Sequence, residues 1–261
     1  MARYDSAPFI GLVIMKIGRN SDIWRLLFAS DRFPVRIRAR KCYPAAMLRY
    51  DRDFRRLAFC LAALAGFVDA VGFLKTGGLF VSFMSGNSTR MAIGLPGATA
   101  MGLAAAALIG LFVCGVILNV LLAAAITIAH RKVVAMATVA VLLCGAALCQ
   151  SAGLDLAAIA ALCLAMGASN TIFRRDGEVS IGVTYMTGTL VKLGDRIANA
   201  ALGGDRTAWV PYLLLWLALL VGGILGTAAY GRSADAGIWI AAAFATLLVP
   251  VTHRLCANRP A

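Results

Sequence analysis

The chain has 261 residues, of which 61% are hydrophobic and only 14% are charged. Soluble domains carry about 25% charged residues, so this composition argues against an ordinary soluble enzyme and predicts a membrane protein. The formal net charge is +13, and residues 1–56 supply +8 of it. Because basic residues before and between apolar segments orient membrane helices, we expect no nucleic acid partner.

The first 55 residues differ from the rest, because they are polar and basic with one short apolar run over residues 9–15. That run is too short to cross a bilayer, and no clear cleavage site follows it. We predict a disordered cytoplasmic extension over residues 1–55 and a membrane domain over residues 56–255. In an alternative interpretation, translation begins at Met47.

Six segments are apolar enough to cross a bilayer, which takes roughly 20 residues. They are residues 57–75, 103–128, 133–151, 155–173, 209–230 and 237–253. Two further stretches, residues 79–95 and 180–202, are short, interrupted by glycine and rich in Ser and Thr. They either cross the membrane or enter it and return.

The charges of the loops favour the second possibility, in which both stretches enter the membrane and return to the side from which they came. If both stretches re-enter, the basic pairs Arg131-Lys132 and Arg174-Arg175 face the cytoplasm together with both chain termini. If both cross, these pairs face outward, against the excess of Lys and Arg found in cytoplasmic loops. We therefore predict an all-α integral membrane protein, multi-pass in the bacterial inner membrane, with six transmembrane helices plus two re-entrant, broken segments.

Polar residues recur at a matching spacing in the two halves of the chain. Asp69 aligns with Asn170, 101 residues later, and residues 84–87 (Met-Ser-Gly-Asn) align with residues 186–189 (Met-Thr-Gly-Thr), 102 residues later. This recurrence predicts an internal duplication. The alternative is chance similarity between membrane helices rich in small residues.

The first copy covers about residues 56–151 and the second about residues 155–255. Three spans separate one copy from the next, and an odd number turns the second copy upside down. We therefore predict two inverted three-helix repeats, a plan common among secondary transporters, whose broken helices meet near the middle of the bilayer.

The same residues resemble the YoaK family of bacterial inner-membrane proteins. The resemblance rests on residues 65–73, 80–89, 167–170 and 184–190, and it covers about residues 55–255. It implies a multi-pass membrane protein and no established activity.

Asp69 lies well inside the first apolar segment. A charge in hydrocarbon is costly, so such residues are usually paired, turned to the protein interior or functional. One interpretation is a proton or cation site. The other is a packing charge neutralised by Arg90 or Lys192.

The hydroxyl-rich patches that follow suit a binding site, because glycine lets the backbone leave helical geometry and approach a ligand. The YoaK pattern usually has threonine before Gly-Asn, and Ser85 keeps that hydroxyl here. Alternatively, these side chains only cap short helices and bind nothing. The candidate substrate- or ion-binding residues are Asp69, Ser85, Asn87, Arg90, Asn170, Thr187 and Thr189.

Signals for catalysis are missing from the sequence. The two histidines, His130 and His253, stand at the ends of predicted spans, and the seven cysteines lack metal-ligand spacing. We expect no enzyme, no cofactor and no metal. The leading hypothesis is a transporter of an unidentified small solute, coupled to protons or a cation. The alternatives are a passive channel and a non-transporting scaffold or regulatory protein. The expected partners are the lipid bilayer and the solute, and a homo-oligomer is compatible with the sequence.

Overall fold

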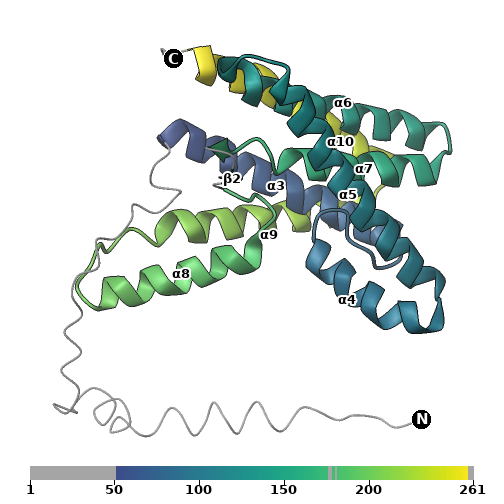
Figure 1. Cartoon of the computed structure of the whole chain (residues 1–261), viewed down its shortest axis with the longest axis horizontal. Coiled ribbons are helices and arrows are strands. Elements are labelled where there is room, and N and C mark those ends of the chain that lie inside the picture. The colour runs from purple at the N-terminus through teal and green to yellow at the C-terminus, as the bar shows by residue number, and fades with distance from the viewer. Residues whose placement is uncertain (1–50, 176–177, 180, 258–261) are drawn as a thin grey trace, which may run out of the picture. The chain divides into compact units, whose positions relative to one another are not determined.

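The structure is a computed structural model that describes residues 51–175, 178–179 and 181–257 (Figure 1). Most of the predicted extension over residues 1–55 lies outside this range, and the first described helix begins at Arg52. Within the described residues the fold is helical, except for the short antiparallel strands β1 (Arg174–Arg175) and β2 (Glu178–Val179).

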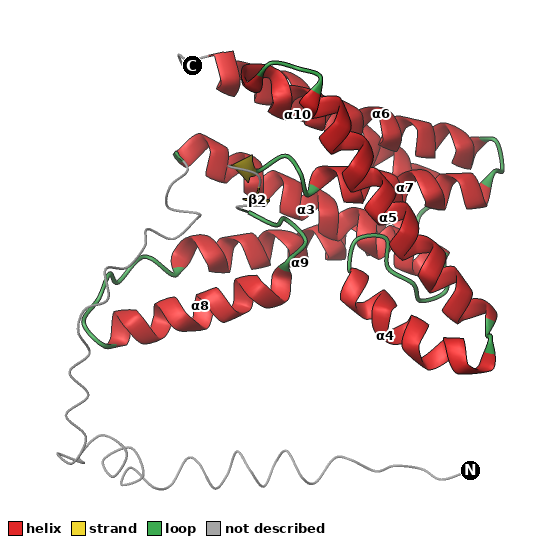
Figure 2. Ribbon diagram, viewed as in Figure 1, coloured by secondary structure: helices red, strands yellow, loops and turns green. Residues whose placement is uncertain are grey.

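The described residues contain eight α-helices and two 3-10 turns in chain order (Figure 2). They are α3 (Arg52–Lys75), α4 (Met84–Gly94), η2 (Leu95–Gly97), α5 (Ala100–Ala124), η3 (Ile128–His130), α6 (Arg131–Ser151), α7 (Asp155–Ser169), α8 (Met186–Ala201), α9 (Val210–Tyr230) and α10 (Ala234–Ala257).

Five of these helices, α3, α5, α6, α9 and α10, are long and apolar enough to cross a membrane. They place the chain in a lipid bilayer. The sixth predicted span is shorter than expected, because α7 has 15 residues and ends at Ser169 instead of continuing to residue 173. The backbone turns there, with the N–H of Asn170 donating to Gly167 O and that of Thr171 to Ala168 O. By length alone, the described helices give five spans and one shorter apolar helix.

The two broken stretches contain the short helices α4, with 11 residues, and α8, with 16 residues. At 1.5 Å per residue, neither reaches across a hydrocarbon layer of about 30 Å. Each packs against the helix that follows it, α4 on α5 and α8 on α9 (Figure 1). Each broken stretch is therefore the first arm of a helical hairpin.

Contacts between helix ends show which ends lie together. Lys132 Nζ, at the start of α6, lies 4.3 Å from the ring centroid of Phe54, at the start of α3. At the other end of α3, Lys75 Nζ lies 2.5 Å from Asp155 Oδ1, at the start of α7. The starts of α3 and α6 thus share one end of the bundle, and the end of α3 shares the other with the start of α7.

Helix α3 packs closely along α9 through small residues. A Cβ atom added to Gly66 would overlap the carbonyl oxygen of Leu219, and one added to Gly222 would overlap that of Ala63. Backbone therefore lies directly on backbone, as small residues permit between membrane helices.

Helices α5 and α7 meet in the same way. A Cβ atom added to Gly167 would overlap the carbonyl oxygen of Phe112, and one added to Gly115 would overlap that of Leu164. The side chain of Asn119 on α5 adds a hydrogen bond of 3.0 Å to the carbonyl oxygen of Ala168. Asn119 thus links the two helices.

Replacing Gly222 with alanine should therefore destabilise the protein by about 1–3 kcal/mol, because the new methyl group must push two backbones apart. Gly145→Ala in α6 is the matched control, since a Cβ there meets no atom within 4 Å. That control should leave stability unchanged or raise it by up to about 1 kcal/mol through helix propensity. Unfolding of the purified variants in detergent measures both; equal stability of the two would contradict the packing.

Candidate functional site

The carboxylate of Asp69 holds the broken stretch that precedes α4. Asp69 Oδ1 accepts the backbone N–H groups of Val81 and Ser82 at 2.9 Å and 2.8 Å. Segment 76–83 thus folds back beside α3 to the level of Asp69 before α4 begins. A carboxylate close to the start of a helix also matches the partial positive charge there.

This arrangement shows which groups contact the carboxylate of Asp69. Among the described residues, no ion pair joins it to Arg90 or Lys192, so the interpretation as a packing charge paired with one of these cations finds no support. Neutral backbone N–H groups bind the carboxylate instead.

Asn87, in the first turns of α4, completes the tether. Its side chain is fully buried; Oδ1 accepts the N–H of Phe80 at 2.9 Å, and Nδ2 donates to the carbonyl oxygen of Phe80 at 2.6 Å. Thr76 Oγ1 accepts the N–H of Leu79 at 2.9 Å. Side-chain oxygens therefore accept all four successive N–H groups of residues 79–82. Both amide atoms of Asn87 therefore bond to the backbone of Phe80 and help to hold the broken stretch.

Arg90 packs against aromatic rings. Its guanidinium carbon lies 5.7 Å from the ring centroid of Phe73 and 5.8 Å from that of Phe80. The two rings are in contact, with centroids 4.7 Å apart. Ser85, the remaining predicted residue of this cluster, is exposed in the first turn of α4.

The second cluster, around Asn170, is held by different hydrogen bonds. Asn170, just after α7, accepts a hydrogen bond of 3.1 Å from the hydroxyl of Thr184. The hydroxyl of the buried Thr189 donates to the carbonyl oxygen of Tyr185, the residue just before α8, and Thr187 is exposed. In the first cluster the carboxylate of Asp69 accepts two backbone N–H groups. At the matching position of the second cluster, the amide of Asn170 accepts one hydroxyl group.

We expected the two broken stretches to meet at one central site, and the structure corrects this. The main packing partner of α4 is α5 and that of α8 is α9, and an α4–α8 pair is not among the principal contacts of the described helices. The hydrogen bonds described above join the predicted residues into two groups, one around Asp69 and one around Asn170.

A cavity of about 510 Å³, widely open to the outer surface of the helices, lies beside the first cluster, between α3, α9 and Phe80. Its walls are largely apolar, with Phe73, Leu219 and Ile224 among them, and its polar side chains are Asp69 and Thr227. Cavities of 300–1,000 Å³ suit small molecules. A carboxylate in such a wall can attract a cation or exchange a proton. Ser85, Asn87 and Arg90 do not line this cavity.

Sequence reasoning missed Thr76 and Phe80. A usable signal was present, because Thr76 is followed by Gly77 and Gly78, which adopt positive φ angles of 68° and 123° and reverse the chain directly after α3. A threonine next to such a turn is well placed to bond the returning backbone.

The fold and these tethers define a multi-pass helical membrane protein with two short helices folded into hairpins. Residues 57–251 match the family described as "Protein of unknown function (DUF1275)", and the chain belongs to that family. It is similar to the UPF0700 transmembrane protein RA0705 of Rhizobium meliloti (strain 1021), with 32% identity over 200 residues, which are 76% of this chain and 86% of that protein. No solved structure matches the chain significantly.

These comparisons confirm the membrane character and the family of unknown activity that the resemblance implied. The name YoaK itself stays a prediction.

Asn87→Leu should cost about 2 kcal/mol or more of stability, because both backbone groups of Phe80 lose their partner. Ser85→Ala is the control in the same helix turn, and we expect a change within about 0.5 kcal/mol because Ser85 is exposed. Thermal unfolding of the purified proteins measures both. A stable Asn87→Leu protein would show that the tether is not needed.

Proposed function

We propose that this protein is a bacterial inner-membrane transporter of a small solute, and that Asp69 carries the coupling proton or cation. One observation carries the proposal: the carboxylate of Asp69 stands in the wall of a largely apolar cavity of about 510 Å³ within the membrane domain. Ionisable groups inside membrane segments mark ion and substrate pathways. A transport role requires no catalytic residue and no cofactor.

The geometry also supplies a means of coupling. The same carboxylate that lines the cavity accepts the two N–H groups that tether the first hairpin. Hydrogen bonds to an ionised acceptor are worth about 1.5–3 kcal/mol, against about 0.5–1.5 kcal/mol for neutral pairs. Protonation or cation binding at Asp69 therefore weakens the tether and changes the cavity wall together.

The proposed topology has both termini in the cytoplasm, six passes that include the short α7, and two re-entrant hairpins. The contact of Lys132 with Phe54 supports it, because a full crossing by residues 79–95 would move the start of α6 to the membrane face opposite the start of α3. The contact of Lys75 with Asp155 supports it at the other face.

We further propose that the two halves are inverted repeats. Their closest helix contacts support this, since Gly66 and Gly167, 101 residues apart, each meet a backbone carbonyl of a partner helix, at Leu219 and Phe112. In this arrangement α3 corresponds to α7 and α9 corresponds to α5. The first helix of each half thus packs on the hairpin helix of the other half.

Asp69→Asn should abolish accumulation of the solute against its gradient while leaving downhill exchange intact. A thermal-shift screen of the purified protein against metabolites finds the solute, and vesicles with an imposed pH gradient then measure its uptake. Asp53→Asn is the control, because Asp53 is an exposed aspartate on the same helix.

Unchanged uphill uptake by Asp69→Asn would remove the coupling role and favour a passive channel. If no solute stabilises the protein, the result favours the alternative of a non-transporting scaffold. Stabilisation that Asp69→Asn abolishes would argue against it.

Single cysteines at Ala98 and Arg206, in a background without native cysteines, test the topology. A membrane-impermeant maleimide should label Ala98→Cys in intact inner-membrane preparations from the periplasmic side. Arg206→Cys should react only after permeabilisation. The reverse pattern at Ala98 would mean that residues 79–95 cross the membrane.

A further inference from the structure

Helices α3 and α9 run parallel, so both begin at the same end of the bundle. A Cβ atom added to Gly222 would overlap the carbonyl oxygen of Ala63, and one added four residues later, to Gly226, would overlap that of Phe67. The contact thus advances along both helices in the same direction. At the shared end, an open groove of about 440 Å³ lies between the first turns of α3 and those of α9.

Three arginines of α3, Arg52, Arg55 and Arg56, line this groove, and none of its described lining residues is acidic. Arg56 has a partner, because its guanidinium donates to Asp53 Oδ1 at 3.0 Å in an exposed pair. Among the described residues, no ion pair or hydrogen bond engages the side chain of Arg52 or Arg55. Two arginine side chains of the groove are therefore available to an anion.

The aspartates that stand near the groove in the sequence do not supply that anion. Asp205 Oδ1 accepts both the N–H and the hydroxyl of Thr207, at 2.8 Å and 2.9 Å. Asp51, just before α3, also has a partner, and neither aspartate lines the groove.

Further into the membrane domain the groove becomes apolar. Its remaining lining residues are Phe59 on α3, Thr207 before α9, and Val210, Pro211 and Leu214 on α9. At 1.5 Å per residue, Phe59 lies about 10 Å further along α3 than Arg52. Leu214 is 43% exposed, so the protein leaves this wall partly uncovered. The groove therefore changes from cationic to apolar over a length that matches a lipid headgroup and the beginning of an acyl chain.

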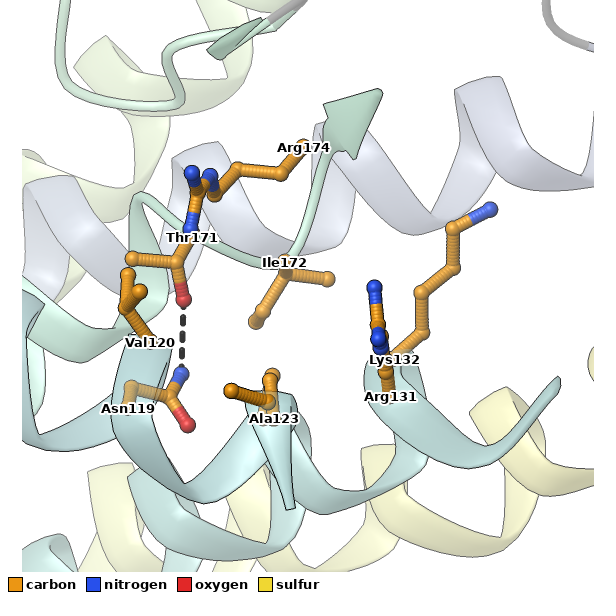
Figure 3. Close-up of a pocket in the computed structure, with 10 residues that line it drawn as sticks. Asn119, Val120, Ala123, Arg131, Lys132, Thr171, Ile172 and Arg174 are labelled. Carbon is orange, nitrogen blue, oxygen red and sulfur yellow. Dashed lines mark hydrogen bonds between the residues drawn. The ribbon is translucent and has the colours of Figure 1, made fainter. Parts of the chain in front are cut away.

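Another basic cavity, of about 360 Å³, lies between the end of α5, the start of α6 and the turn that follows α7 (Figure 3). Its cations already have partners. Arg131 Nε donates to the carbonyl oxygen of Ile126 at 3.3 Å, Lys132 Nζ lies over the ring of Phe54, and Arg174 has an interaction of its own. The groove between α3 and α9 is the better place for an anion, because two of its three arginines are not engaged in this way.

We propose that the groove binds one anionic phospholipid of the surrounding bilayer, with its phosphate at Arg52 and Arg55 and an acyl chain along Phe59 and Leu214. Arginine N–H groups match the oxygens of a phosphate, and basic pockets between membrane helices bind anionic headgroups. A soluble anion would leave the apolar wall uncovered, and a zwitterionic lipid brings a cation that the arginines repel. Residues 1–50 are themselves basic, so charge does not favour them as the occupant.

The test is the thermal stability of the purified full-length protein in a neutral detergent with phosphatidylglycerol, with phosphatidylcholine of the same acyl chains, or with inorganic phosphate. We expect phosphatidylglycerol to stabilise the protein saturably, phosphatidylcholine to stabilise it less, and phosphate alone to have no effect. Arg52→Gln or Arg55→Gln should weaken the apparent affinity for phosphatidylglycerol about fivefold, and the double variant about thirtyfold, as expected for charges lost at a lipid surface.

Arg254→Gln is the matched control, because Arg254 is an exposed arginine in the last turn of α10 and does not line the groove. It removes the same charge, and the affinity should change less than about twofold if the groove is the site. Arg52 is exposed, so Arg52→Gln alone serves if the double variant does not fold.

Equal stabilisation by phosphatidylglycerol and phosphatidylcholine would overturn the proposal, as would an unchanged response of the arginine variants. An equal loss of affinity in Arg254→Gln would show that general surface charge attracts the lipid, and stabilisation by phosphate alone would show a soluble anion instead; both contradict the lipid site. Because the groove does not include Asp69, each of these results would leave the proposed transport function unaffected.

Discussion

A backbone N–H group that is buried away from water must find an acceptor within the protein, and the first half of this chain depends on that constraint. Where α3 ends and the chain turns back, Thr76, Asn87 and Asp69 accept the N–H groups that a helix would otherwise have bonded internally. Without water, each unmet group would cost several kcal/mol. The broken stretch is thus stable because three side chains replace helical hydrogen bonds.

The same constraint explains which sequence-based expectations agreed with the structure. Hydrophobic length predicted the five long helices, and glycine with hydroxyl residues predicted where helices break. The pattern did not predict the end of α7, because residues 170–173 are as buried as a helix core and yet turn. Hydropathy predicts whether a residue is buried from water, but it does not predict whether the backbone there continues as a helix or turns.

The candidate residues divide by the same reasoning. Asp69 was singled out by its cost in hydrocarbon, and it both tethers a hairpin and lines a cavity. Asn87 was expected to contact a solute, and in the structure both of its amide atoms form hydrogen bonds with the backbone of Phe80. Sequence identifies which polar groups are unusual; only the fold shows which of them are already satisfied.

The close packing of α3 on α9 has a consequence for biosynthesis. The ribosome completes α3 well over a hundred residues before it begins α9, so the face of α3 that carries Ala63 and Gly66 enters the membrane without its partner. Until then that face must rest against lipid or a membrane chaperone. A chain interrupted before Val210 would keep this face exposed, which gives cellular quality control a feature by which to recognise an unfinished molecule.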